Sequence, residues 1–461
     1  MRAGGAQAIS ARLDRLPATR QVWTLVVLLS VGGCFELYDL LMTAYISPGL
    51  IREGIFAAGA KGFLGLPDQA AFASITFAGL FVGTILLGSI ADRFGRRRIF
   101  TLSLLWYSAA TLLMVTRSTR LGVDLWRFVA GIGIGVELVT IDTYIAELVP
   151  GRLRGRAFAV NQSVQFLCVP IAALLGWLLV PLDPFGVAGW RFVAGFAALA
   201  AIVVWFIRLR VPESPRWLAQ HGRVGEADRI MSALEARVAA EARAPLPPPA
   251  EPAGAAGEGR GGFAEIWRPP YRSRTIMMMV FNVCQAIGFY GFGNWVPALL
   301  AAQGAGFTKS LEYSFIIALA SPVVPLLFLV FADRTERKWQ IVAAACGTAS
   351  FGMLFTLSTA PAWLVACGIG VTLSNNLLSY AFHAYQPELF PTRVRARAVG
   401  FVYSFSRLST VFSSFMIAFF LQNFGAPGVF AFIAAAMLIV VISIAGFGPR
   451  TRGLALEAIA H

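Results

Sequence analysis

Two groups of charged and turn-forming residues occur twice in this chain, at the same spacing. Each member of the first copy recurs 241 positions later, as Asp92 recurs in Asp333. The first copy comprises Ala91, Asp92, Arg93, Arg97, Tyr144, Glu147, Pro150, Arg154 and Arg156, and only Arg97 changes in the second copy, to Lys338. A register kept over this distance indicates two homologous halves with charged clusters at matching helix ends. A duplicated apolar chain is typical of transporters whose halves rock against each other.

The composition places the chain in a membrane. Of 461 residues, 57% are hydrophobic and only 13% are charged, which is too few charges for a soluble domain of this size. The net charge is +14, but the arginines lie in short turns between apolar spans rather than in a basic patch with stacking aromatics. We therefore expect contact with the lipid bilayer and no nucleic-acid partner.

The hydrophobic spans predict an all-α membrane protein. About 20 apolar residues cross the hydrocarbon core as a helix. Twelve such spans are expected, at 22–46, 70–91, 99–116, 122–148, 157–181, 189–209, 275–300, 313–332, 339–359, 361–388, 397–422 and 428–447.

These spans divide the chain into five segments. Two six-helix halves, 22–209 and 273–447, are preceded by an N-terminal segment, 1–21, and followed by a tail, 448–461. Between them, 210–272 is hydrophilic, helical at first and then rich in Pro, Gly and Ala, which predicts a disordered linker there.

The positions of the arginines set the expected orientation. The turns after spans two, four, eight and ten are rich in Arg, whereas the turns of the other parity are poor in basic residues. By the positive-inside rule both termini lie in the cytoplasm. The heavy use of Arg over Lys suggests a bacterial source, so we expect a multi-pass protein of the inner membrane.

Catalytic and metal-binding constellations are not found in the sequence. The five cysteines fall in apolar segments without metal-ligand spacing, and no Ser/His, His/Asp or metal-ligand cluster is seen. We therefore expect no enzyme, no cofactor and no metal site.

The segment from Gly88 to Arg98 (GSIADRFGRRR) resembles the loop between helices 2 and 3 that marks the major facilitator superfamily. Further motifs are similar to those of its sugar-porter and metabolite-symporter branches: Gly32-Gly33 with Tyr38-Asp39, the stretch from Arg127 to Arg156, the Pro212-to-Leu218 string, and Pro449 to Gly453. The resemblance covers most of the chain and implies twelve helices in two pseudo-symmetric halves. Arg450 departs from it, because the family usually has Glu there.

The duplicated charges are expected to form a cytoplasmic gate, in which each Glu pairs with an Arg of the opposing half when that side is closed. Simple helix capping and topological anchoring are the alternatives. The gate residues are Asp92, Arg93, Gly95, Arg97, Glu147, Arg154, Asp333, Arg334, Glu388 and Arg395.

Asp39 and Arg127 occupy the places that, in proton-coupled sugar symporters, hold the proton carrier and its partner. A carboxylate in a membrane is disfavoured by desolvation and stabilised by a nearby guanidinium, so protonation would release the pair. Glu36 lies one turn before Asp39 and is an alternative carrier. A permanent structural ion pair is the other interpretation.

The cargo-binding pattern departs from that of sugar porters. Gln162 matches it, but Gln285, Tyr290 and His383 stand where several sugar-binding amides and a Trp are expected. Glu137 and Asp142, where sugar porters have small or neutral residues, resemble those of organic-acid transporters. Arg407, inside the eleventh span, is suited to hold a carboxylate with two parallel hydrogen bonds.

The sequence therefore predicts a secondary transporter that takes up a small organic acid or aromatic carboxylate together with protons, by alternating access. A sugar or polyol porter of the same fold is the alternative; a transport-dead sensor or a membrane enzyme fits less well. We expect a small-molecule substrate and protons as partners, and function as a monomer.

Overall fold

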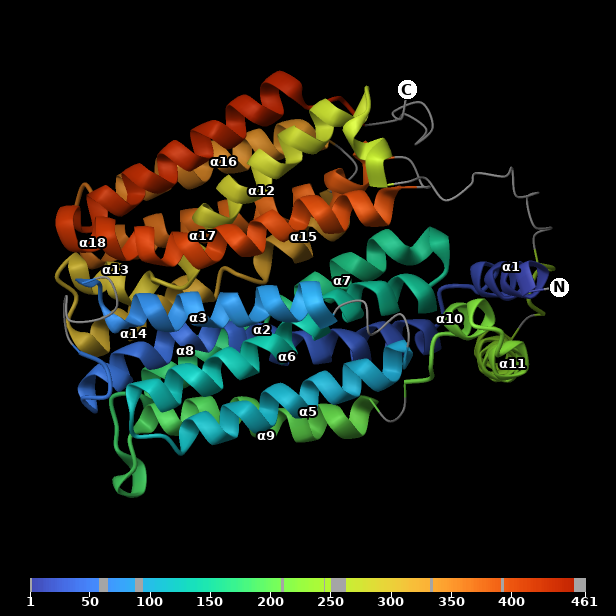
Figure 1. Cartoon of the computed structure of the whole chain (residues 1–461), viewed down its shortest axis with the longest axis horizontal. Coiled ribbons are helices and arrows are strands. Elements are labelled where there is room, and N and C mark those ends of the chain that lie inside the picture. Colours follow the sequence, from blue (N-terminus) through green and yellow to red (C-terminus); the bar gives the residue numbers. More distant parts are fainter. Residues whose placement is uncertain are drawn as a thin grey trace.

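The computed structural model describes residues 2–57, 65–87, 94–208, 211–243, 245–249, 263–331, 335–390 and 394–451. Every regular element in these ranges is a helix. The helices form two bundles that lie side by side along the chain's long axis, as Figure 1 shows. The all-α membrane fold expected from the hydrophobic spans is confirmed.

The first bundle contains the spans of the N-terminal half, and two of them are interrupted. A π-helical turn, η2, extends the second span, and the fifth span is broken between Phe166 and Cys168. The elements are α2 (Arg20–Arg52), α3 (Asp68–Val82), η2 (Gly83–Leu87), α5 (Arg96–Val115), α6 (Arg120–Leu148), η3 (Gly151–Leu153), α7 (Arg154–Phe166), α8 (Cys168–Leu179), η4 (Pro184–Gly186) and α9 (Gly189–Arg208).

The second bundle repeats this arrangement. Its elements are α12 (Tyr271–Gly293), α13 (Val296–Ala302), α14 (Phe307–Ala318), α15 (Val323–Phe331), α16 (Arg337–Phe355), α17 (Pro361–Tyr385), η6 (Gln386–Leu389) and α18 (Arg395–Phe447). The last element, α18, contains both final spans. They are joined at Gly425, where the chain reverses its direction with a φ of 64° and a ψ of −164°, values that suit only glycine. Eight helices in the described ranges are long and apolar enough to cross a membrane by length and composition, and one of these is the doubled 397–447 helix.

The two bundles meet along apolar helix faces. The contacts join α3 to α18, α8 to α14, and α7 to α15. Trp177 stacks on Phe315 with ring centroids 5.7 Å apart, and the Ser74 hydroxyl donates to the Val411 carbonyl at 2.8 Å. Such contacts are few and mostly apolar, which suits an interface whose halves have to move.

Within the N-terminal bundle, α3 and α6 cross at the distance of backbone contact. A Cβ atom on Gly79 or Gly83 would overlap a carbonyl oxygen of α6, and a Cβ on Gly131 or Gly135 would overlap one of α3. Small residues at such a crossing let membrane helices pack by van der Waals contact where no hydrophobic effect drives them together.

We predict that Gly131→Val separates α3 from α6 and lowers stability by about 1–3 kcal/mol, the usual cost of overpacking. The matched control is Gly195→Val on α9, where an added Cβ meets nothing within 4 Å. Thermal unfolding of the detergent-purified variants measures the difference, and equal stability of the two would contradict the close crossing.

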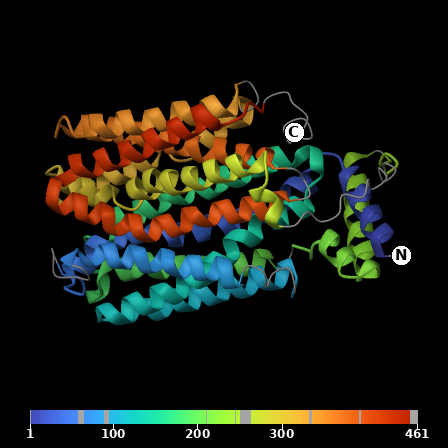
Figure 2. The same cartoon turned by 45° about the horizontal axis from the view of Figure 1, so that its top comes forward.

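A small helical cap lies at one end of the bundle. It consists of α1 (Arg2–Asp14), α10 (Pro215–Gln220) and α11 (Val224–Ala242), which contact one another. Figures 1 and 2 both show it beyond the ends of the long helices, with the N-terminus. We call this the capped end and the opposite one the loop end. The sequence predicted a helix for α11, but α1 lies in a segment for which no helix was expected.

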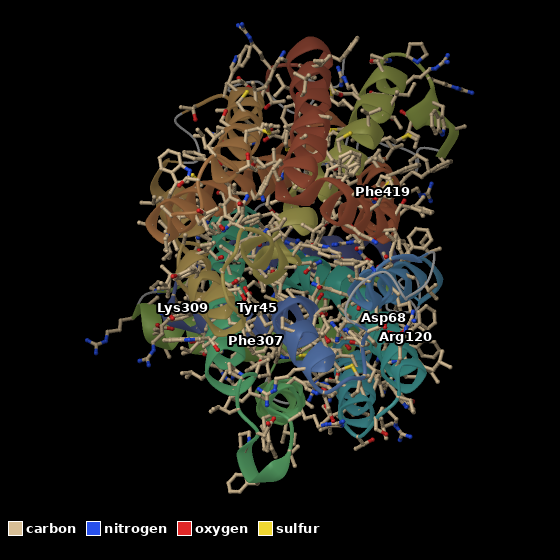
Figure 3. All side chains as sticks on the ribbon, turned by 90° about the vertical axis from the view of Figure 1, so that its left-hand side faces the viewer. Tyr45, Asp68, Arg120, Phe307, Lys309 and Phe419 are labelled. Atoms are coloured by element: carbon tan, nitrogen blue, oxygen red, sulfur yellow. The ribbon has the colours of Figure 1, made fainter. Side chains whose placement is uncertain are left out.

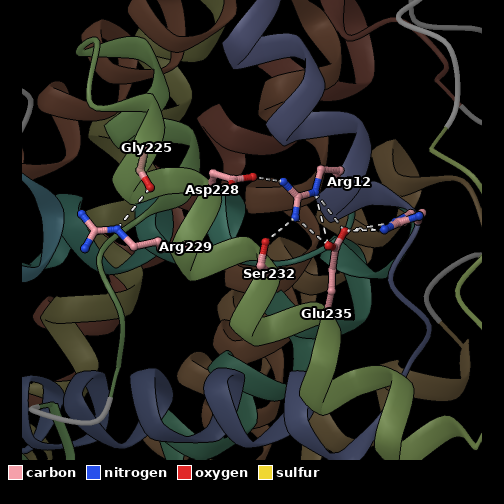
Figure 4. A network of polar contacts seen from close by, with 7 residues as sticks. Arg12, Gly225, Asp228, Arg229, Ser232 and Glu235 are labelled. Carbon is pink, nitrogen blue, oxygen red and sulfur yellow. Dashed lines mark hydrogen bonds and ion pairs between the residues drawn. The ribbon is translucent and has the colours of Figure 1, made fainter.

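Partly exposed ionic contacts connect the helices of the cap (Figure 4). Arg12 pairs with Asp228 and, at 2.7 Å, with Glu235, and Arg15 pairs with Glu235 at 2.7 Å. The Glu241 carboxylate accepts hydrogen bonds from the backbone N–H groups of Arg20 and Gln21. It therefore caps the first turn of α2, whose N–H groups have no partner within the helix.

The pKa of Glu235 is lowered in the folded protein. Partial burial alone would raise it, but the hydrogen bonds from Arg12 and Arg15 outweigh burial. A carboxyl with a depressed folded pKa contributes stability above its unfolded value of about 4.3, and the contribution is lost as the pH falls through the folded value.

We therefore predict that α1 detaches from α11 on acidification below about pH 4, and that Glu235→Gln weakens docking already at neutral pH. Limited proteolysis after Arg15 measures the detachment. Glu226→Gln on the same helix, which removes only a surface pair with Arg223, should leave the cleavage rate unchanged. Equal rates for both variants would contradict the role of Glu235.

Candidate functional site

Asp39 and Arg127 form an ion pair in the N-terminal bundle. Asp39 lies on α2 and Arg127 on α6, and the guanidinium Nη1 is 2.8 Å from the carboxylate Oδ2. Both side chains are wholly buried. A charge removed from water this completely needs a partner and hydrogen bonds, since the desolvation cost amounts to several kcal/mol.

Hydroxyl groups complete the shell around this pair. Thr111 donates to Asp39 Oδ1 at 3.1 Å, while Arg127 donates to Thr76 at 3.1 Å and to Thr43 at 2.8 Å. Arg127 also donates to the backbone carbonyl of Asp39 at 2.6 Å. Because some of these bonds do not use the carboxylate, Arg127 keeps a fixed position when the charge on Asp39 changes.

Arg407 lies in the other bundle, on α18, and is 2% exposed. Its Nη1 donates to the Tyr290 hydroxyl at 2.6 Å and its Nη2 to the Tyr403 hydroxyl at 2.8 Å. Both partners are neutral phenols, and the guanidinium also lies 4.8 Å from the Tyr403 ring centroid. The positive charge is thus held by dipoles and a ring rather than by a carboxylate in hydrogen-bond contact.

Glu36 connects the two bundles electrostatically. It lies on α2, is 5% exposed, and its charge acts on Arg407 of the other half. The two neighbouring acids of α2 therefore interact with different arginines. Asp39 forms an ion pair with Arg127 inside one half, and the charge of Glu36 attracts Arg407 across the interface. The sequence predicted Arg127 as the partner of Asp39 and left open whether Glu36 or Asp39 carries the proton.

Two more of the expected cargo residues lie next to Arg407. The Gln285 amide donates to the Ser406 hydroxyl at 3.2 Å. His383 Nδ1 is 2.7 Å from the Ser379 carbonyl oxygen, and its ring lies 5.6 Å from that of Tyr403. Tyr290, Gln285, His383 and Arg407 therefore form one cluster, which we call the Arg407 cluster.

The remaining candidates lie elsewhere. Gln162 is half-buried on α7, and Glu137 is wholly buried on α6. The side chain of Asp142 lies outside the part that the structure describes. Neither Gln162 nor Glu137 is among the residues that line the cavity described next.

A cavity of about 50 Å³ lies between the halves. One wall comes from α2, α7 and α8, with Leu41, Tyr45 and Phe166, and the other from α12, α13, α14, the turn after α14, and α17. The lining is apolar and aromatic except for Ser314, Ser321, Thr372, Asn375 and Asn376.

Sequence reasoning missed the two asparagines of this cavity. Asn376 donates to the Ser321 carbonyl at 2.8 Å, and Asn375 accepts from Thr348 at 3.0 Å and donates to the Gly288 carbonyl at 3.2 Å. The sequence does contain a signal for them, because Asn375 and Asn376 are consecutive amides inside an apolar span. Polar groups in a membrane helix face the protein interior, so the pair could have been predicted to lie there.

Part of the expected gate contacts the cap. The Glu213 carboxylate accepts from the Arg97 backbone N–H at 3.1 Å, and Gly95 packs so closely on Glu213 that a Cβ would lie 2.7 Å from its Oε2. Gly95 also has a φ of 101°, which disfavours any other residue. Asp92, Arg93, Asp333 and Arg334 lie outside the described residues.

The duplicated glutamates pair differently from the expectation. Glu147 pairs with Arg96 at 3.1 Å and Glu388 pairs with Arg337, so each partner lies in the same half as its glutamate. The pairing across the halves, which was expected for a closed cytoplasmic side, stays a prediction. Arg395 instead donates to the Phe390 carbonyl at 3.1 Å, and Arg154 is half-buried at the start of α7.

Comparison with known proteins places this architecture in a family. A model of the family described as "Sugar (and other) transporter" matches residues 25–461. YyaJ of Bacillus subtilis (strain 168), whose name assigns it to metabolite transport, is 30% identical over 96% of this chain and 95% of its own. The niacin transporter NiaP of Acinetobacter baylyi is 26% identical over 97% and 99%.

Solved structures agree on the fold. The xylose transporter XylE from E. coli, in a partially occluded inward-open conformation, superposes with a TM-score of 0.73 at 18% identity, covering 94% of this chain and 99% of that one. The chain is therefore a membrane transporter rather than an enzyme, and it belongs to the sugar (and other) transporter family of the major facilitator superfamily.

Proposed function

We propose that this protein is a proton-coupled transporter that takes up a small organic acid, most suitably an aromatic carboxylate, by alternating access. The observation that carries the proposal is the Arg407 cluster: a buried guanidinium on the C-terminal half that is held by two phenols and attracted by Glu36 of the other half. Among the described residues no carboxylate lies in hydrogen-bond contact with this guanidinium, and a carboxylate is the ligand that suits it.

The cargo carboxylate would replace or share the phenol contacts of Arg407. A guanidinium offers two parallel N–H donors, which match the two oxygens of a carboxylate. Tyr290 packs edge-on against Phe77 of the other half, with centroids 4.8 Å apart, and against Phe289. An aromatic cargo would therefore meet aromatic side chains from both halves beside the cation.

The proton would be carried by Asp39. In the charged state Arg127 holds the carboxylate inside the N-terminal half. Protonation removes that attraction, while Arg127 retains its bonds to Thr43, Thr76 and the Asp39 carbonyl. The energy of the α2–α6 contact then depends on one proton, which is what coupling of transport to a proton gradient requires.

The capped end would face the cytoplasm and the loop end the outside. The turns rich in Arg, including Arg96 to Arg98 and Arg152 to Arg156, lie at the capped end together with α1, α10 and α11. The positive-inside rule assigns such turns to the cytoplasmic side of an inner membrane. We propose that the protein works as a monomer.

The names of the relatives support this choice of cargo class. NiaP of Acinetobacter baylyi is named for niacin, an aromatic carboxylic acid, and the Bacillus subtilis NiaP, 24% identical, is named for niacin and nicotinamide. Nicotinate and nicotinamide are therefore suitable probes, because they differ only in carboxylate against neutral amide.

We predict that Asp39→Asn abolishes concentrative uptake but retains counterflow exchange, because the amide keeps the shape of the carboxyl and cannot cycle a proton. Uptake and counterflow of nicotinate in proteoliposomes with an imposed proton gradient measure this. Asp183→Asn, an exposed carboxyl at the loop end paired with Arg52, is the control. Normal accumulation by Asp39→Asn would remove Asp39 from the proton pathway.

Loss of folding has to be separated from loss of coupling. Breaking one partner of a buried ion pair costs about 3–5 kcal/mol. The double variant Asp39→Asn/Arg127→Gln leaves no unpaired charge, so it should recover stability in thermal unfolding without recovering concentrative uptake.

We further predict that nicotinate raises the unfolding temperature of the purified protein more than nicotinamide does, and that Arg407→Lys weakens this effect by at least about tenfold in affinity. Lysine keeps the charge but offers no two-pronged donor. Arg407→Ala should remove the effect altogether. Equal shifts by both probes would contradict a carboxylate site at Arg407.

A sugar or polyol porter is the second candidate. The amides Asn375 and Asn376 beside the central cavity favour it, since sugar sites rely on several fixed polar contacts. Stabilisation by xylose or a hexose, lost in Gln162→Ala but kept in Arg407→Ala, would favour this function over acid uptake.

A further inference from the structure

A second charged cluster lies at the loop end, one helical turn outside the Asp39–Arg127 pair. Arg120, Asp124 and Arg127 follow one another on α6 at spacings of four and three residues, so they share one helix face. Arg120 is about 10 Å from Arg127 along the helix axis. The proton-coupling role proposed for Asp39 does not use this outer cluster.

One guanidinium serves two carboxyl groups in it. Arg120 Nη1 lies 2.7 Å from Asp68 Oδ1, and Arg120 Nε lies 3.5 Å from Asp124 Oδ2. The Arg120 side chain is 32% exposed, whereas those of Asp68 and Asp124 are 4% and 8% exposed. Figure 3, which looks at the loop end, shows Asp68 beside Arg120. The arginine thus reaches the medium, and the two carboxyls lie behind it.

Two carboxyl oxygens of the cluster have no hydrogen-bond donor. Asp68 Oδ2 accepts from the Ala57 backbone N–H at 2.8 Å. Asp68 Oδ1 and Asp124 Oδ1 are buried, and neither accepts a hydrogen bond from any residue that the structure describes. The Arg120–Asp68 contact has the distance of an ion pair without hydrogen-bond geometry. A buried acceptor without a donor is unfavourable.

The charge of the cluster is also unbalanced. With both carboxyls ionised, the outer cluster carries one more negative charge than positive charges. The helices packed on α6 here are α2, α3 and α5. From α3, Asp68 faces this part of α6. From α2, the charged group on this face is Asp39, whose charge is already neutralised by Arg127.

The third packed helix supplies no compensating cation in the described residues near Asp124. On α5, Tyr107 and Thr111 are buried and uncharged, and Thr111 donates to Asp39. Arg117, in the turn between α5 and α6, is exposed and donates to the Leu113 carbonyl. One bound proton would correct both deficits, since it removes the excess charge and provides an O–H donor.

We propose that Asp68, Arg120 and Asp124 form a proton-binding site at the loop end, with Asp124 as the group that takes the proton from the medium on that side. The proton adds to the Asp124 carboxylate and leaves it again as a proton, so no other bond changes. Asp124 lies one turn from Arg127, and the site therefore collects the proton that Asp39 carries onward. This inference rests on the proposed proton coupling only for the onward step.

The binding step is tested without transport. Infrared difference spectra of the purified protein between acid and neutral pH should contain a protonated-carboxyl band that disappears in Asp124→Asn and persists in Asp39→Asn. Asp183→Asn at the same end is the control for an exposed carboxyl. An unchanged band in Asp124→Asn would overturn the site, whatever happens to the proposed transport function.

Because Asp68 and Asp124 share the guanidinium of Arg120, replacing Asp68 should shift the titration midpoint of Asp124 in a known direction. Asp68→Asn leaves Arg120 to Asp124 alone, so the midpoint of the Asp124 band should move to lower pH by at least about one unit. The loss of the negative charge of Asp68 acts in the same direction. A midpoint that stays in place or moves to higher pH would contradict the sharing of Arg120.

The transport arm uses nicotinate in proteoliposomes. Asp124→Asn should lower the initial rate of proton-driven uptake severalfold and flatten its dependence on the pH at the loop end, while counterflow exchange remains. In Asp39→Asn concentrative uptake is lost altogether, so the two failures are distinguishable. Replacing sodium by choline should change neither rate, and a sodium-dependent rate that requires Asp124 would assign the site to a metal cation and overturn the proposal.

Discussion

A charge buried among apolar helices has to find a partner, and this requirement organises the centre of the molecule. Asp39 and Arg127 satisfy it within the N-terminal half, through a contact of 2.8 Å and a shell of threonine hydroxyls. Arg407 satisfies it in another way, with two phenols and the field of Glu36. The first arrangement joins two opposite charges, whereas the second holds a positive charge with neutral hydrogen-bond partners.

The difference between these two arginines separates the roles of the halves. The pair in the N-terminal half lies on a rigid crossing, because glycines bring α3 and α6 into backbone contact next to it. The Arg407 cluster lies at the interface, where Tyr290 packs against Phe77 of the other half. In the proposed function, a proton on one side and a cargo anion on the other would therefore bias the same movement through different contacts.

The cap adds a constraint at one end only. Glu241 caps the first turn of α2, and Arg12 and Arg15 bind α11 through Glu235. The start of α2 is thus tied to the segment that joins the halves, while the loop end carries the Asp68–Arg120–Asp124 cluster instead. The two ends of the N-terminal half therefore differ in ionic structure, as a transporter with unequal sides requires.

The sequence by itself determined the fold, the duplication and the residue types at the centre, because the length of apolar spans and the cost of intramembrane charge are local properties. It predicted neither the helix α1 nor the cavity asparagines, and it assigned Glu147 and Glu388 to partners across the halves. Only the tertiary structure showed the threonine shell around the expected Asp39–Arg127 pair and the two phenols that hold Arg407, and it pairs each gate glutamate with an arginine of its own half. Pairing depends on which helix faces meet, and helix rotation and packing between distant spans are not written in any local pattern.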